Sequence, residues 1–291
     1  MNYQHSYHCG NFADIIKHNI LIFCLEKLHE KPTSFLAIDT HAGDGKYDIF
    51  SEKLLKTNEF NEGLKKILTR DFLKILPSKY LEILAKINVC SIDELPQKIK
   101  YYPGSPLIIK NFLRYHDKAI FAETQNDIFI NLRKNFAGNK KILCTKENGF
   151  DLLKSKLPPL EKRAIILIDP AYEKNHDKIS RDYELALQAL QEGFKRCNYG
   201  IFLLWYPIIK GDEKLLNNFY KQISKLKFDK SHHLIFDIGE NHEKPHKMHS
   251  CGLFIFNMPW QVDEKINLFL PKLLQNLQNN STANFSLKAL S

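Results

Sequence analysis

The sequence predicts an α/β protein built on one open, doubly wound sheet of seven mostly parallel strands. Two observations lead to this prediction. Short runs rich in Ile, Leu, Phe and Val recur along the chain, and most of them end at a polar, Gly or Pro residue. The longer segments between these runs carry apolar residues at i, i+3 and i+4, which is the spacing of an amphipathic helix. Strands that alternate with helices form a parallel sheet with helices on both faces.

The expected strands are continuous apolar runs, as is typical of strands that are covered on both faces. The last two runs lie close together in the sequence, so we expect an antiparallel pair at one edge of the sheet. In chain order the strands are predicted at Phe35–Asp39, Ala119–Glu123, Lys141–Thr145, Ala164–Asp169, Gly200–Tyr206, His233–Ile238 and Cys251–Asn257.

One interval interrupts this alternation. Between Gly45 and Tyr101 the sequence has no strand-like run, only a Lys- and Leu-rich helical periodicity. We therefore expect a small helical subdomain at residues 47–100, inserted after the first strand of a main domain that comprises residues 1–46 and 101–291. At the other end of the chain, the tail is rich in Asn and Ser from Gln275 onward and is expected to fray.

The chain has 291 residues, with 42 Lys and Arg against 33 Asp and Glu. The net charge of +9 favours an anionic partner only weakly, because the Lys residues are spread along the chain. The first residues lack the features of a signal peptide, and no apolar stretch approaches the ~20 residues that span a bilayer. Six cysteines without a C-x-x-C pair argue against a zinc ribbon or a disulfide scaffold. We therefore expect a cytoplasmic protein with no membrane segment.

The first candidate site is the turn Asp39-Thr-His-Ala-Gly-Asp-Gly45, directly after the first strand. In open α/β sheets, ligands bind beyond the carboxyl ends of the strands. Gly43 and Gly45 would allow the backbone to approach a ligand closely. The turn lacks the third glycine of a dinucleotide-binding motif, and a tight connection from strand to helix explains it about as well.

The second candidate is Asp169-Pro170-Ala171-Tyr172, at the end of the most apolar strand. The Asp169 carboxylate and the Pro170 carbonyl can both accept from an exocyclic NH₂ group, and Tyr172 can stack on a planar base. This combination suits an amine on a flipped nucleobase. A strand that ends in an ordinary Asp-Pro turn is the competing interpretation.

Three further stretches follow strands or begin helices. Glu123 ends the second strand, where a carboxylate can hold ribose hydroxyls. Asn148 and Gly149 follow the third strand and could contact the edge of an adenine ring, although Asn-Gly is also an ordinary turn dipeptide. In the segment 101–106, Ser105 and the Pro after it have the pattern of an N-cap and a first helical turn. Such a helix N-terminus can receive an anionic group, but simple capping is the safer interpretation.

A histidine-rich stretch lies between the last two predicted strands. His242, His246 and His249 have a spacing that metal ligands can have, but Lys and Pro residues interrupt them and no cysteine pair supports a site. We therefore expect no metal. A solvated loop that touches an anionic substrate is the preferred interpretation, because His and Lys suit phosphate contacts.

Together these motifs resemble those of known methyltransferases. Asp-Pro-Ala-Tyr resembles the D/N-P-P-Y/F motif of S-adenosylmethionine-dependent enzymes that act on adenine or cytosine amines. More narrowly, the chain resembles the RlmJ family of bacterial large-subunit ribosomal RNA adenine-N6 methyltransferases, earlier described as factors for the use of external DNA. The matching stretches are Tyr3-x-His-Ser-Tyr-His-x-Gly-Asn-x-Ala-Asp-x-x-Lys-His18, Asp39-Thr-His-Ala-Gly-x-Gly45, Tyr101-Tyr-Pro-Gly-Ser-Pro106, Leu167-Ile-Asp-Pro-x-Tyr172 and Trp205-Tyr-Pro207.

The resemblance implies a Rossmann-like methyltransferase fold with S-adenosylmethionine as the cofactor. It also implies N6-methylation of an adenine in 23S ribosomal RNA, with the adenine flipped into the active site of a monomeric enzyme. Asp169 matches the catalytic position, with Pro170 and Tyr172 beside it, and Tyr3 matches a residue that contacts the RNA. The positions that match cofactor contacts are His18, His41, Ser105, Glu123, Asn148, Gly149 and Asp169.

Two positions depart from the family's pattern. Ala171 stands where the motif has a second Pro, and Asn148 stands where an Asp is usual. The key carbonyl belongs to Pro170 and an amide oxygen can still accept from an adenine amine, so neither change removes a group that the reaction needs. The alternatives are a DNA adenine methyltransferase, a decayed methyltransferase that only binds RNA, and a nucleotide-dependent oxidoreductase, which the missing third glycine disfavours.

Overall fold

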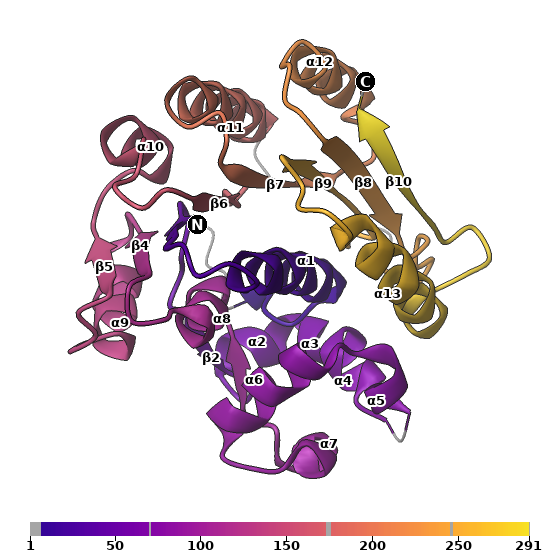
Figure 1. The fold of residues 1–291 in the computed structure, drawn as a ribbon. Coiled ribbons are helices and arrows are strands. Elements are labelled where there is room, and N and C mark those ends of the chain that lie inside the picture. Colours follow the sequence, from indigo (N-terminus) through magenta and orange to yellow (C-terminus); the bar gives the residue numbers. More distant parts are fainter. Residues whose placement is uncertain (1–6, 70, 173–175, 245–246, 291) are drawn as a thin grey trace.

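The computed structural model describes residues 7–69, 71–172, 176–244 and 247–290. Its centre is an eight-stranded sheet with the strand order β10-β8-β9-β7-β6-β1-β4-β5 (Figure 1). The strands are β1 (Leu36–Asp39), β4 (Lys118–Ala122), β5 (Ile142–Thr145), β6 (Ala164–Ile168), β7 (Ile201–Ile208), β8 (Ser231–Asp237), β9 (Ser250–Phe256) and β10 (Asn284–Leu290).

All of the predicted strands are present, and each lies within two residues of its expected bounds. In the order of the sheet, the neighbouring strands β5, β4, β1, β6 and β7 are all parallel. β9 pairs antiparallel with both β7 and β8. The predicted α/β class and the antiparallel edge are therefore confirmed. Because β9 is the strand that reverses direction, β8 runs parallel to β7 and its carboxyl end lies on the same edge of the sheet.

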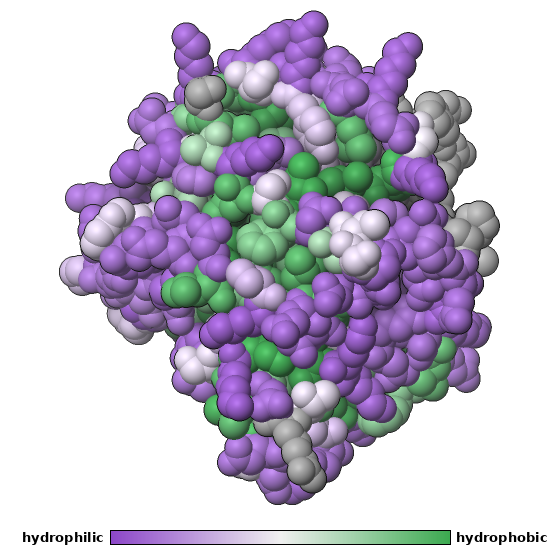
Figure 2. All heavy atoms as spheres, turned by 90° about the vertical axis from the view of Figure 1, so that its right-hand side faces the viewer, coloured by the Kyte–Doolittle hydropathy of each residue, from purple (hydrophilic) through white to green (hydrophobic). Residues whose placement is uncertain are grey.

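The eighth strand, β10, corrects two predictions: the sheet has eight strands and not seven, and the tail after Gln275 does not fray but forms a strand. β10 pairs antiparallel with β8 over its full length and so covers an edge that would otherwise expose unpaired backbone groups. Phe285 and Leu287 pack against the main core. Figure 2, which looks onto the side that carries β10 and α13, shows a band of apolar side chains bordered by hydrophilic ones. The alternation of polar and apolar residues in an edge strand is a weaker signal than a continuous apolar run.

Helices cover both faces of the sheet. One face is covered by α10, α11 and α12, and the other by α1, α8, α9 and α13 (Figure 1). α1 is apolar around most of its circumference because it lies between the sheet and other helices. These helices are α1 (Phe12–His29), α8 (Ser105–Phe112), α9 (Asn126–Asn135), α10 (Gly149–Lys156), α11 (His176–Arg196), α12 (Glu213–Ile223) and α13 (Val262–Leu277).

The inserted segment is helical, as predicted, but it begins and ends in a short sheet. β2 (Lys46–Asp48) pairs antiparallel with β3 (Tyr101–Pro103), so the expectation of no strand after Gly45 is wrong. A strand of three residues has no apolar run that could reveal it. The apolar side chains of the insert join the buried cluster that contains α1 and α13, and the division into two domains stays a prediction. The helices of the insert are α2 (Glu52–Thr57), α3 (Glu59–Glu62), α4 (Leu64–Ile67), α5 (Phe72–Ile75), α6 (Ser78–Asn88) and α7 (Leu95–Lys98).

None of the described helices combines the length and the apolar character that a membrane-spanning helix needs.

Candidate active site

The turn after β1 is the centre of the candidate site. Asp39 ends the strand and is fully buried. Its Oδ1 accepts the N–H of His41 at 3.2 Å, and its carboxylate also interacts with the Ser105 hydroxyl. Asp39 Oδ2 is buried without a hydrogen-bond partner among the described residues. Burial raises the pKa of Asp39 to about 6, and the neighbouring Asp169 adds to the rise. The carboxylate is thus an acceptor that a ligand donor could satisfy.

The next part of the turn contains Gly43 and Gly45 and is held by Glu123. Gly43 and Gly45 have φ values of +58° and +76°, a region that side chains disfavour. The Gly43 N–H donates to the Glu123 carboxylate, which also accepts from the N–H of Gln125 at 2.8 Å. Burial raises the pKa of Glu123. The predicted cofactor residues that follow β1 and β4 therefore lie together.

Helix α10 begins against the same turn. A Cβ atom on Gly149 would lie 1.7 Å from the Thr40 carbonyl oxygen, so only glycine fits there. The His41 ring packs edge-on against Phe150 with ring centroids 4.6 Å apart, and burial lowers the pKa of His41 to about 3, so the ring is neutral. Asn148 is exposed and caps α10, because its Oδ1 accepts from the Phe150 N–H at 2.9 Å. Its contact with an adenine ring stays a prediction.

His18 and Ser105 lie on the side of the turn that faces the insert. His18 is buried in α1, where its Nδ1 is 2.9 Å from the Tyr102 hydroxyl and its ring stacks on the same residue. Gly104 donates its N–H to the Gly45 carbonyl at 2.9 Å and caps α8. Since Gly104 is the N-cap, Ser105 is the first residue of α8 and not the N-cap that the sequence predicted. Its hydroxyl interacts with the buried carboxylate of Asp39.

A buried charge cluster at the end of β6 was missed by the sequence analysis. Lys17 Nζ contacts Asp169 Oδ2 and lies 2.9 Å from Asp14 Oδ1. The Lys17 and Asp14 side chains are only 4% and 3% exposed. Burial alone would lower the pKa of Lys17, but the two carboxylates outweigh it and raise the pKa, so the ammonium stays charged. The sequence does contain a signal for part of this cluster, because Asp14 and Lys17 are three residues apart and so lie on the same face of a helix.

Of the remaining residues of the Asp-Pro-Ala-Tyr motif, Pro170 and Tyr172 are buried, whereas Ala171 is half-buried. Tyr172 adopts a φ of +44°, which is uncommon for a residue other than glycine. The Tyr172 ring is 4% exposed, packs against Tyr183 and Trp205, and donates its hydroxyl to the Trp205 carbonyl at 3.0 Å. Stacking of Tyr172 on a base requires the ring to turn outward, and it stays a prediction.

Two residues singled out in the sequence, Tyr3 and His246, lie outside the described residues. His249 lies at the base of its loop, with Nδ1 3.0 Å from Asp237 Oδ1. Within the ranges that the structure describes, no group of three or more His, Cys, Asp or Glu residues is arranged to hold a metal ion.

The fold and this site together define a class of protein. The turn after β1 and the acidic residue after β6 end neighbouring parallel strands, so a ligand held by the turn would lie beside the Asp169-Pro170 pair. This is the arrangement of a Rossmann-like methyltransferase. The chain belongs to the RlmJ family, since the family described as "Ribosomal RNA large subunit methyltransferase D, RlmJ" matches residues 32–289.

Individual relatives agree over almost the whole chain. The "Ribosomal RNA large subunit methyltransferase J" of Haemophilus influenzae is 31% identical over 99% of this chain and 98% of its own length. The protein of the same name from Escherichia coli is 33% identical over 95% of this chain and 94% of its own length. A crystal structure of a Legionella pneumophila protein has a TM-score of 0.84 at 29% identity and covers 98% of this chain and 99% of its own.

Proposed function

We propose that this methyltransferase transfers a methyl group from S-adenosylmethionine to the N6 amine of an adenine in 23S ribosomal RNA. Membership of the RlmJ family supports an RNA substrate from the large ribosomal subunit. The observation that carries the choice of an amine is the Asp169-Pro170 pair at the end of β6, beside the turn after β1. We expect the enzyme to act as a cytoplasmic monomer.

The residues of the turn fit the proposed cofactor. Asp39 Oδ2 is a buried acceptor without a partner among the described residues, and S-adenosylmethionine carries an ammonium group and ribose hydroxyls that need acceptors. Glu123 would hold the ribose hydroxyls, and the absence of a side chain at Gly149 lets the start of α10 pack directly against the turn. When bound, the cofactor supplies an electrophilic methyl group on a sulfonium sulfur.

The target amine needs activation by the protein. The lone pair of adenine N6 is delocalised into the ring, so the amine is a poor nucleophile. Hydrogen bonds from its two protons to the Asp169 carboxylate and the Pro170 carbonyl would localise the lone pair and stabilise the developing positive charge. The amine becomes strongly acidic only after methyl transfer, so Asp169 need not be a strong base. Correct positioning can supply several kcal/mol of the barrier reduction.

Lys17 is a positioning residue in this proposal. Its ammonium contacts Asp169 Oδ2 and lies 5.6 Å from the centre of the Trp205 ring. The contact orients the carboxylate and directs its other oxygen, Oδ1, toward the amine. Because the cluster is almost fully buried, the ammonium also compensates the negative charge of Asp14 and Asp169.

Methyl transfer to matched RNA and DNA tests the proposal. The purified protein is incubated with methyl-labelled S-adenosylmethionine and either a fragment of 23S ribosomal RNA or DNA of the same sequence, and the nucleosides are separated. We expect N6-methyladenosine from the RNA alone. Transfer only to DNA would favour the DNA methyltransferase, and RNA binding without cofactor binding would favour a decayed enzyme.

A further inference from the structure

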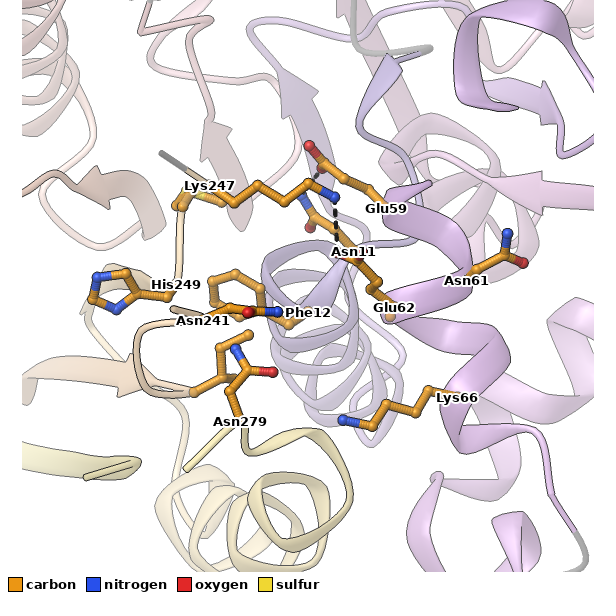
Figure 3. Close-up of a pocket in the computed structure, with 13 residues that line it drawn as sticks. Asn11, Phe12, Glu59, Asn61, Glu62, Lys66, Asn241, Lys247, His249 and Asn279 are labelled. Atoms are coloured by element: carbon orange, nitrogen blue, oxygen red, sulfur yellow. Dashed lines mark hydrogen bonds and ion pairs between the residues drawn. The ribbon is translucent and has the colours of Figure 1, made fainter. Parts of the chain in front are cut away.

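A cavity of about 300 Å³ lies near the candidate active site and has no role in the reaction described above (Figure 3). It opens between the first turn of α1, the insert helices α3 and α4, and the loop that joins β8 to β9. The carboxyl end of β8 lies on the same edge of the sheet as Asp169, because β8 runs parallel to β7 and β6. The cavity therefore faces the edge where the substrate is expected.

The distance between the cavity and the charge cluster is short. Asn11 and Phe12 line the cavity, and both belong to the beginning of the helix that carries Lys17. Asn11 precedes Lys17 by six residues, which is ~9 Å along a helix axis. An RNA whose target adenine lies at Asp169 could therefore place a nearby nucleotide in the cavity.

The acidic residues of the cavity are already paired. Glu62 contacts Lys244 and lies 2.8 Å from Lys247, which ties the β8–β9 loop to the insert. Burial would raise the pKa of Glu62, but these two lysines outweigh it and lower the pKa. Glu59 Oε2 accepts from the side chain of Asn11 at 2.9 Å. The carboxylates are thus compensated and repel an anion less than isolated ones would.

The ammonium group of Lys66 can bind a negatively charged group of a ligand. It is exposed, and its hydrogen bond in the described structure is a long one of 3.4 Å to the Leu277 carbonyl. Figure 3 shows its ammonium pointing into the opening, toward Asn279. The preceding Lys65 is also exposed but does not line the cavity.

Two amide side chains supply a donor and an acceptor on the opposite wall. Asn241 Oδ1 accepts from the Glu243 N–H at 3.0 Å, and its NH₂ group has no partner among the described residues. Asn279 donates its NH₂ to the Gly239 carbonyl at 2.9 Å, and within the same part of the chain its Oδ1 has no donor. A donor beside an acceptor matches the polar edge of a nucleobase or ribose.

We propose that this cavity binds a nucleotide of the RNA substrate close to the target adenine, with Lys66 on its phosphate and Asn241 and Asn279 on its base or ribose. This inference rests on the proposed function, because it assumes that the substrate is RNA. The volume lies at the lower end of the ~300–1,000 Å³ of ligand pockets, which suits one nucleotide rather than a larger ligand. The apolar wall around Phe12 would cover one side of the base.

A ladder of RNA oligomers tests the nucleotide site. Each oligomer contains the target adenosine and is longer than the last by one nucleotide on one side, and KM and kcat for methyl transfer are measured for the wild type, Lys66→Ala and Lys65→Ala. The two variants lose the same charge from the same helix. We expect one added nucleotide to lower the KM of the wild type and of Lys65→Ala by roughly tenfold, the scale of a hydrogen bond to a charged group. Lys66→Ala should lose this step and keep its kcat.

Equal ladders for the two variants would overturn the nucleotide site. RNA binding by fluorescence anisotropy, measured on the same oligomers without cofactor, separates this result from failure of the proposed function. If no variant methylates RNA, the proposed reaction is wrong, and the step in binding affinity still decides whether the cavity holds a nucleotide. A step that appears with DNA but not with RNA would also contradict the proposal.

Discussion

Asp169 is the residue on which the proposed chemistry depends, and its surroundings come from three parts of the chain. The strand β6 places it at the carboxyl edge of the sheet, Lys17 of α1 holds one of its oxygens, and Pro170 supplies the adjacent carbonyl. The carboxylate is only 11% exposed, so its geometry is set by protein groups rather than by water. Replacement of Asp169 and replacement of Lys17 should therefore have different effects on turnover.

Replacement of Asp169 by Ala removes an acceptor for the target amine. We expect turnover to fall at least ~10²-fold, the scale of losing one preorganised polar group. Cofactor affinity should fall less, because the predicted contacts lie mainly on the turn after β1 and on Glu123. Asp169→Asn should keep partial activity, because its oxygen still accepts. Single-turnover methyl transfer and a cofactor titration measure both effects, and near-normal turnover of the Ala variant would contradict the mechanism.

Replacement of Lys17 by Gln should lower turnover more than it lowers cofactor affinity. Without the ammonium, Asp169 loses the contact that orients Oδ2, and the negative charges of Asp14 and Asp169 are no longer compensated in their nearly buried cluster. Single-turnover methyl transfer and a cofactor titration measure the two effects. Cofactor binding that stays near that of the wild type shows that the variant is folded. Turnover equal to that of the wild type would mean that Lys17 has no such role.

The buried Asp39 predicts a pH-dependent change in stability. Its pKa of about 6 lies above the ordinary value of 3.8, so the folded state binds this proton more tightly than the unfolded chain does. The resulting stabilisation is present below the lower value and is lost as the pH rises through about 6. Asp39→Asn keeps the oxygen that accepts from His41. Its free energy of unfolding relative to the wild type should rise by roughly 1.4 kcal/mol between about pH 5 and about pH 8. Urea unfolding at the two pH values measures this, and an equal difference at both would refute the assignment.

Single residues also show what the sequence could and could not predict. The placement of Glu123, Gly149 and Asp169 at one edge of the sheet could be predicted because each follows an apolar run that marks a strand end. The contact between Lys17 and Asp169 joins positions 152 apart in the chain, and local periodicity carries no information about such a pair. The capping role of Asn148 and the unpartnered oxygen of Asp39 likewise depend on tertiary structure.

At the scale of elements, the parallel strands position the site and the antiparallel strands complete the sheet. The turn after β1, the end of β4 and the start of α10 meet because β1 pairs with β4 and β4 pairs with β5, the strand that precedes α10. The sequence predicted these strands well, because buried central strands are continuous apolar runs. It missed β2, β3 and β10, which are short or lie at an edge, where side chains alternate or remain polar.

Deletion of residues 281–291 tests the role of β10. The strand covers the outer edge of β8, so its loss should expose unpaired backbone groups and the core side chains against which Phe285 and Leu287 pack. We expect a lower melting temperature and aggregation that increases with protein concentration. The site lies several strands away, so methyl transfer per folded molecule should change little. A truncated protein as stable and monodisperse as the full chain would show that β10 is dispensable.

At the scale of the whole molecule, the insert and the main sheet pack against each other. They share a buried cluster, and Lys244 and Lys247 tie the β8–β9 loop to Glu62 of the insert. The net charge of +9 predicted an anionic partner only weakly, and the positions of the charges are more informative than their sum. One edge of the sheet combines the turn, the Asp169 cluster and the cavity at Lys66, which is the surface where we expect RNA.

The most direct test of the central claim is the N6-methyladenosine content of 23S ribosomal RNA in cells. Nucleosides from this RNA are measured by mass spectrometry in cells with the gene, without it, and with the deletion complemented by the wild type or by Asp169→Ala. We predict that deletion removes N6-methyladenosine from one position, and that the wild type restores it whereas Asp169→Ala does not. An unchanged amount of N6-methyladenosine after deletion would contradict the assignment of this protein as a 23S ribosomal RNA adenine methyltransferase.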